Sequence, residues 1–229
     1  MVSEALSVET ATFRAIAFEH GEQLATGGEL STEIRIWNGQ RLDLGAGDTH
    51  YFYCFCGPAV LEAPAGAFPL SSGMYGSLNA VGALVGGGGF VASRRGYRGM
   101  FQLGGPIEET GRLRYIDGCT DSLLLGPVVK GDPCLNHLHI PAKTRQTAHT
   151  HPSLRVGMIV RGRGFCVTPD AEYPLEAGLA FLIEPDELHS FVTGEQSLDV
   201  VVYHPDSDTG PTHEDHPMVN RTIIPEGRR

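Results

Sequence analysis

Turn-forming residues recur along this chain at a fixed offset of 105 positions. The matched residues are Gly57 with Gly162, Pro64 with Pro169, Pro69 with Pro174, Leu70 with Leu175 and Gly73 with Gly178. Glycine and proline fix the positions and types of turns, so a shared pattern of them predicts shared hairpin geometry. We therefore interpret the chain as two copies of one β-unit.

Composition between these turns favours an all-β protein. The 229 residues include 30 glycines and 15 prolines, which separate short runs rich in Val, Ile, Phe and Tyr. Short strands about ten residues apart, with turn signals between them, are typical of a sandwich or barrel. We expect strands near residues 12–18, 30–37, 51–56, 59–62, 74–79 and 89–93, and again near 134–140, 156–161, 164–168, 179–183, 188–193 and 198–203. The predicted division is a first unit at 1–105, a connecting segment at 106–133, a second unit at 134–204 and a polar tail at 205–229.

Charge and hydropathy exclude several classes of partner. The formal net charge is −10, without a local cluster of Lys and Arg, so binding to a nucleic-acid backbone is not expected. The chain contains no long apolar run and no signal-peptide pattern at its start, which predicts a cytoplasmic protein without membrane contact. Five cysteines, an odd number without CxxC spacing, are expected to be reduced.

Three histidines have the spacing expected of a metal site. His149 and His151, in the stretch "HTHPSLRVGMIVRG", are two residues apart, which places two side chains on one face of a strand. His189 follows the Gly178 turn at the start of a later strand, which an antiparallel barrel can bring alongside. Imidazole is the commonest metal ligand among side chains, so these three residues are the candidate ligands.

At these residues the chain resembles the cupin superfamily. "HTHPSLRVGMIVRG" is similar to the first cupin motif, and "GLAFLIEPDELH" is similar to the second, with Pro185 before His189 but no glycine after that proline. The resemblance covers both halves and implies an all-β fold, a double-stranded β-helix (jelly-roll) bicupin. The first copy has Leu44, Ala46 and Leu84 at the positions that correspond to the three histidines, which implies a degenerate copy without metal.

One departure from the cupin pattern concerns the fourth ligand. The glutamate of the usual three-His, one-Glu site is replaced by Arg155, and a permanently protonated guanidinium cannot bind a metal ion. A three-His site resembles that of cupin dioxygenases. We expect Arg155 to act at the catalytic site by forming a bidentate pair with a substrate carboxylate, with an outward, solvated side chain as the alternative.

The predicted function is a metal-dependent cupin enzyme with one divalent ion per chain. Fe(II) is preferred, because three neutral imidazoles leave positions for a small anionic substrate and O₂, and the reaction is then a dioxygenation or an oxidative rearrangement. Zn(II) is the alternative ion. With Zn(II) the protein would be an isomerase, a lyase or a hydrolase, a group in which we include N–N bond-forming biosynthetic enzymes. A binding bicupin without turnover is the second alternative. The resemblance also implies a homodimer, since cupins commonly pair through sheet edges.

Further histidines lie outside this motif. His137 and His139, again two residues apart, are candidate substrate-binding residues as well as candidate structural ones. His204, His213 and His216 are flanked by Pro, Gly, Thr and acidic residues, and we interpret them as part of a solvated tail rather than a metal cluster.

Overall fold

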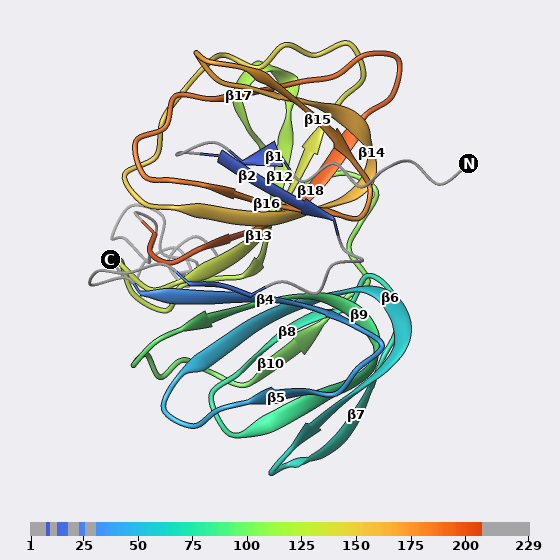
Figure 1. The fold of residues 1–229 in the computed structure, drawn as a ribbon, viewed down its shortest axis with the longest axis vertical. Coiled ribbons are helices and arrows are strands. Elements are labelled where there is room, and N and C mark those ends of the chain that lie inside the picture. Colours follow the sequence, from blue (N-terminus) through green and yellow to red (C-terminus); the bar gives the residue numbers. More distant parts are fainter. Residues whose placement is uncertain (1–7, 10–12, 18–22, 26–30, 208–229) are drawn as a thin grey trace, which may run out of the picture.

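The computed structural model describes residues 8–9, 13–17, 23–25 and 31–207, which form two antiparallel β-sheets stacked along the long axis of the molecule (Figure 1). The larger sheet has the order β1-β2-β16-β14-β18-β13-β12-β11, and β15 and β17 both pair with β14. Its strands are β1 (Val8–Glu9), β2 (Phe13–Ala17), β11 (Leu113–Arg114), β12 (Thr120–Leu125), β13 (Cys134–Ile140), β14 (Arg155–Val167), β15 (Glu172–Glu176), β16 (Leu179–Ile183), β17 (Ser190–Val192) and β18 (Leu198–His204). A 3₁₀ turn, Ile116–Gly118, precedes β12.

The smaller sheet has the order β10-β8-β6-β9-β4-β3, with β5 paired to β9 and β7 paired to β6. Its strands are β3 (Gln23–Ala25), β4 (Thr32–Asn38), β5 (Leu42–Leu44), β6 (Thr49–Ala63), β7 (Gly66–Leu70), β8 (Tyr75–Leu78), β9 (Gly82–Arg94) and β10 (Gln102–Gly104). Together the two sheets confirm the all-β prediction.

The offset of 105 residues is repeated in the strand register. The corresponding cross-strand pairs are Leu61 with Phe68 and Cys166 with Tyr173, and His50 with Leu78 and Arg155 with Ile183. β6 therefore pairs with β7 and β8 in the same register as β14 pairs with β15 and β16. This agreement supports the interpretation that the turn pattern encodes one hairpin geometry twice.

Two pairs of expected strands are continuous in the structure. The segments expected at 51–56 and 59–62 form β6, and those at 156–161 and 164–168 form β14. The register shifts between Cys54 and Ala59 in β6 and between Ile159 and Arg161 in β14. Gly57 lies within the irregular part of β6, whereas Gly162 follows the irregularity of β14 and pairs with Leu198. Neither glycine ends its strand, and glycine within a strand often accompanies such irregularities.

The strand expected at 12–18 forms as β2, but it extends the second sheet. β2 pairs with β16, with Phe13 opposite Ile183. The Phe13 ring is fully buried and stacks on Tyr173 with centroids 4.2 Å apart. Burial of an aromatic side chain stabilises this pairing, although the two strands are far apart in the sequence.

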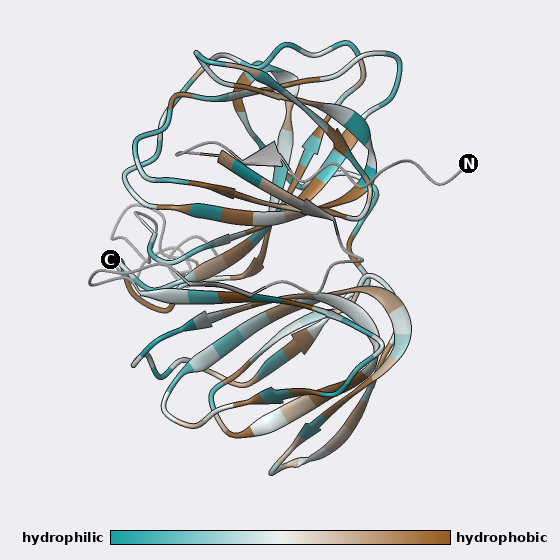
Figure 2. Cartoon of the chain, viewed as in Figure 1, coloured by the Kyte–Doolittle hydropathy of each residue, from teal (hydrophilic) through white to brown (hydrophobic). Residues whose placement is uncertain are grey.

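Three apolar clusters hold the sheets together. One fills the first unit, around Trp37 and Leu61, and another fills the second, around Ile159 and Phe181. The third joins the outer faces of the two units, where the Tyr51 and Tyr203 rings lie 5.2 Å apart. Figure 2 shows apolar residues, in brown, along strands of both sheets. The interior of each unit is therefore separate from the contact between the units.

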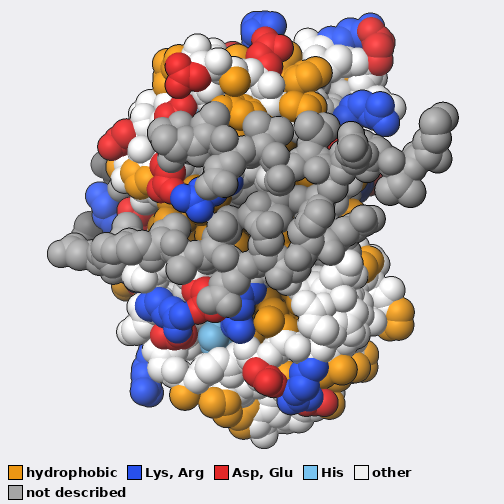
Figure 3. Space-filling view, viewed as in Figure 1, with side chains coloured by type: hydrophobic (Ala, Val, Ile, Leu, Met, Phe, Trp, Pro, Cys, Tyr) orange, Lys and Arg blue, Asp and Glu red, His pale blue; other side chains and the backbone are white. Residues whose placement is uncertain are grey.

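The surface has mixed charge in the view of Figure 3, where acidic and basic side chains are interspersed over the described residues. All five cysteines are free thiols, and four of them are buried. Among the residues that the structure describes, no helix is long and apolar enough to cross a membrane.

Candidate metal centre

The backbone brings His149, His151 and His189 together at one end of the second unit. His149 and His189 form an antiparallel bridge outside the regular strands, with N–H to carbonyl distances of 2.9 and 3.0 Å in the two directions. His151 follows two residues after His149. The candidate ligand atoms of the three side chains all lie within 4.8 Å of one another. The three histidines predicted from the sequence therefore form one cluster.

Hydrogen bonds fix which ring nitrogen of two histidines is available. Nδ1 of His149 lies 2.8 Å from the carbonyl oxygen of Thr147, and Nδ1 of His189 lies 2.8 Å from that of Glu187. A carbonyl oxygen only accepts, so each Nδ1 carries the proton and each Nε2 keeps its lone pair. Such bonds from the far ring nitrogen orient imidazole ligands in metal sites.

The local electrostatics favour the neutral form of His151 and His189. Burial lowers the pKa of His151 to about 3, and the positive charge of Arg155 and the neighbouring histidines act in the same direction. Burial likewise lowers the pKa of His189 to about 4, against the opposing effect of its bond to Glu187. At neutral pH these rings hold lone pairs that a divalent cation can accept. Neutral imidazoles suit Fe, Zn and other first-row ions, so the donor set fits a metal.

Arg155 lies beside the three histidines, at the first position of β14. Its Nη1 donates to Ser153 Oγ at 2.8 Å, to the Ser153 carbonyl at 3.1 Å and to the Leu154 carbonyl at 3.0 Å. The Ser153 hydroxyl in turn donates to Asp206. Arg155 is also among the residues that line the cavity of the histidines.

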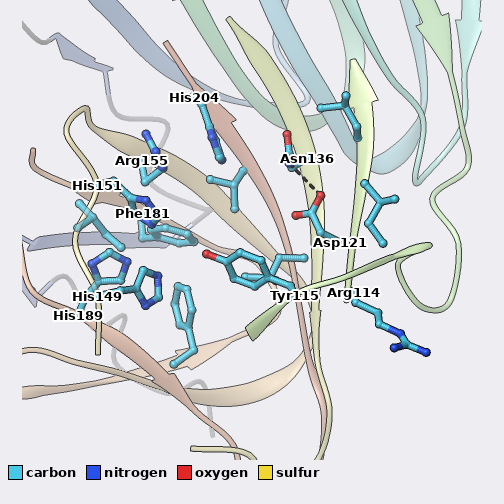
Figure 4. Close-up of a pocket in the computed structure, with 16 residues that line it drawn as sticks. Arg114, Tyr115, Asp121, Asn136, His149, His151, Arg155, Phe181, His189 and His204 are labelled. Carbon is cyan, nitrogen blue, oxygen red and sulfur yellow. Dashed lines mark hydrogen bonds between the residues drawn. The ribbon is translucent and has the colours of Figure 1, made fainter. Parts of the chain in front are cut away.

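A cavity of about 300 Å³ extends from the histidines through the interior of the second unit (Figure 4). Its walls are largely apolar, with Leu138, Phe181, Ile183, Phe191 and Val202 among the lining residues. Its polar residues other than the histidine cluster and Arg155 include Tyr115, Asp121, Asn136 and His204. An apolar cavity with a few polar groups is typical of a small-molecule site.

None of these four polar residues was predicted as a site residue from the sequence. Tyr115 precedes the 3₁₀ turn, and its ring lies edge-on to His149 with centroids 6.5 Å apart. Asp121 lies on β12, and its pKa is raised to about 6, mainly by burial. His204, which we interpreted as part of the tail, is the last residue of β18, where burial and then Arg155 hold its pKa well below the usual range. His213 and His216 lie outside the described residues.

The structure places His137 and His139 away from the cavity. Both lie on β13, where the alternate residues Asn136 and Leu138 face the cavity. His137 Nε2 lies 2.8 Å and His139 Nδ1 lies 3.0 Å from the same oxygen of the buried Asp199. The two histidines therefore contribute to a polar cluster on the opposite face of the sheet, because side chains alternate along a strand.

The corresponding positions of the first unit hold no donor cluster. Leu44 and Leu84 are almost fully buried in the apolar cluster of that unit, and Ala46 is exposed. Leu42 of β5 lies opposite Leu84, so a short strand closes over this end of the unit. Two of these three positions, Leu44 and Leu84, therefore contribute to apolar packing.

Comparisons with known proteins identify the fold. Residues 130–207 match the family model of the AraC-like ligand binding domain, and no curated protein matches the sequence. Protein Ylba from E. coli is 14% identical, with a TM-score of 0.61 over 90% of this chain and 96% of its own. A cupin 2 conserved barrel domain protein from Leptotrichia buccalis is 10% identical, with a TM-score of 0.62 over 87% and 99%. A salicylate 1,2-dioxygenase from Pseudaminobacter salicylatoxidans is 9% identical, with a TM-score of 0.64 over 86% and 85%. The chain therefore has a cupin jelly-roll fold.

Proposed function

We propose that this chain is a metal-dependent cupin oxidoreductase that acts on a small carboxylate-bearing molecule. The observation that carries the proposal is the convergence of three imidazoles at the end of a cavity that Arg155 also lines. A structure with the same fold, salicylate 1,2-dioxygenase, has been determined in complex with gentisate, an aromatic carboxylate. That likeness supports a small organic acid as the class of substrate.

His149, His151 and His189 would hold one divalent ion, with Fe(II) preferred. When bound, Fe(II) would supply the redox chemistry with O₂ that a dioxygenation or oxidative rearrangement needs. The protein itself contributes a cavity lined mainly by apolar side chains, in which charges interact more strongly than in water.

Arg155 would hold the substrate carboxylate close to the histidines. A guanidinium presents parallel N–H donors that match the two oxygens of a carboxylate. Its charge contributes, after burial, to the lowered pKa of both His151 and His189, which supports a position of Arg155 close to the candidate ligands. The same field would attract an anionic substrate to this end of the cavity.

We also propose that the two sheets are the two halves of a bicupin in which only the second half binds metal. The repeated register of β6 and β14 supports a duplication. The buried Leu44 and Leu84 support a first half that contributes packing alone. A homodimer and a cytoplasmic location stay predictions.

The match of residues 130–207 to an AraC-like ligand binding domain favours a second candidate, a protein that binds a small ligand without turnover. Oxygen uptake distinguishes the two. The chain is purified without added metal, reconstituted anaerobically with Fe(II), and mixed with a panel of hydroxylated aromatic and aliphatic carboxylates in an oxygen electrode. The proposal predicts uptake that depends on substrate, on Fe(II) and on His151. Binding of these acids without any uptake would instead support the second candidate, and reconstitution with Zn(II) tests the non-redox alternative.

A further inference from the structure

We propose that Asp121 and Asn136 form a second substrate subsite that binds an N–H donor group, an amine in the first instance. This inference rests on the proposed function, because the carboxylate of the same molecule would lie at Arg155. It narrows the substrate to acids that carry an amino group at a distance from the carboxylate.

The two side chains lie together in the wall of the cavity. Asp121 on β12 pairs with Leu138 of β13, and Asn136 precedes that residue by two positions on the same face. Asn136 Nδ2 donates to one carboxylate oxygen of Asp121 at 2.9 Å. In Figure 4 the other Asp121 oxygen points toward the side of the cavity where the three histidines lie.

These side chains offer acceptors that the described residues leave unused. Asn136 Oδ1 is buried and has no hydrogen-bond partner. Among the described residues no Lys, Arg or His side chain forms an ion pair with Asp121, and its one side-chain hydrogen bond is the one from Asn136. A buried acceptor without a partner, and a desolvated carboxylate without a counterion, both cost free energy. A ligand amine supplies the missing donors and the missing positive charge.

The position of Asp121 sets the spacing between the two groups of the ligand. Arg155 begins β14, and Asp121 lies on β12, with β18 and β13 between those strands in the sheet. Neighbouring strands are about 4.8 Å apart, so the two backbones are separated by about 14 Å across the sheet. The strand register also places Arg155 and Asp121 four residues apart along the strands. The cavity is mainly apolar between them. Both side chains line the cavity and cover part of this separation. An α-amino acid, whose amine and carboxylate share one carbon, is too short to bridge the rest, whereas an ω-amino acid carries its two groups at opposite ends of an extended chain.

Three probes of similar length test the subsite: hexanoate, hexylamine and 6-aminohexanoate. Their binding to the anaerobic, Fe(II)-loaded full chain is measured by isothermal titration calorimetry at pH 7.5. The variants are Asp121→Asn, which keeps the shape and the bond from Asn136, and Arg155→Ala. Asp170→Asn, an exposed residue in the turn between β14 and β15, is the matched control.

The subsite predicts that Asp121→Asn weakens hexylamine and 6-aminohexanoate by about tenfold or more and leaves hexanoate unchanged. Asp170→Asn should change none of the three. Failure of hexylamine to bind, or hexylamine binding that Asp121→Asn does not weaken, would overturn the inference. The proposed function fails separately, if hexanoate does not bind or if Arg155→Ala leaves its affinity unchanged.

Discussion

Asp121→Asn should stabilise the protein at neutral pH, because the carboxylate is partly desolvated without a counterion among the described residues. Burial raises the pKa of Asp121 from 3.8 to about 6, which means that ionisation costs more in the folded protein than in the unfolded chain. A change of this size corresponds to about 3 kcal/mol, since each pKa step is about 1.4 kcal/mol. The side chain keeps some exposure to the open cavity, so solvent screening reduces the expected gain to about 1–1.5 kcal/mol.

The sign of the pH dependence follows from the direction of this shift. Below about pH 3.8 the carboxyl is protonated in both states and costs nothing, whereas above about pH 6 it is ionised in both states and the full cost is present. The asparagine is neutral throughout. Between these limits the stability difference between variant and wild type should grow as the pH rises.

Urea unfolding followed by circular dichroism measures this difference at pH 7.5 and at pH 4.5. Asp170→Asn removes an exposed charge of the same sign and should change stability by less than about 0.5 kcal/mol at both values. If Asp121→Asn is no more stable than wild type at pH 7.5, or is equally stabilised at both pH values, the reasoning about an uncompensated buried charge is refuted.

Substitutions at three further positions, Arg155, Gly162 and Asp199, have outcomes that follow from the structure. Arg155→Ala should weaken carboxylate binding by about 2–5 kcal/mol with metal content unchanged, whereas Arg155→Glu should tighten metal binding and reduce substrate binding. Metal content and substrate affinity are measured on both variants. Wild-type values of both quantities in both variants would show that the arginine is not part of the site. Gly162→Ala should lower the melting temperature strongly, because φ is +75° and a Cβ would meet the Ser197 carbonyl oxygen at 1.8 Å, while Gly194→Ala has open space and serves as the control. Asp199→Ala should cost about 3–5 kcal/mol of stability in urea unfolding, since it removes the buried acceptor of three side-chain donors; a cost below about 1 kcal/mol would contradict this.

The sequence was sufficient for the local features of the fold and of the candidate metal centre. Spacing of two residues, together with a third histidine after a glycine turn, correctly predicted that His149, His151 and His189 form one cluster. The matched turn residues predicted a hairpin register that β6 and β14 share. These features depend on short-range geometry, which a single sequence encodes directly.

Long-range pairing and the choice of face could not be predicted in the same way. A spacing of two residues places His137 and His139 on one face of β13, but only the packing of the sheet decides that this face is opposite the cavity. Asp121 and His204 reach the cavity through the pairing of β12 and β18 with β13, which no local pattern reveals. The pairing of β2 with β16 likewise depends on contacts between distant segments.

Metal stoichiometry is the most direct test of the account. Elemental analysis after anaerobic Fe(II) reconstitution and removal of free metal should find about one ion per wild-type chain. His149→Ala, His151→Ala and His189→Ala should each lose most of that metal while they keep the β-sheet circular dichroism spectrum. His139→Ala, which removes an imidazole outside the cavity, should keep the wild-type content. Full occupancy in all three ligand variants, or an equal loss in His139→Ala, would contradict a metal centre formed by His149, His151 and His189.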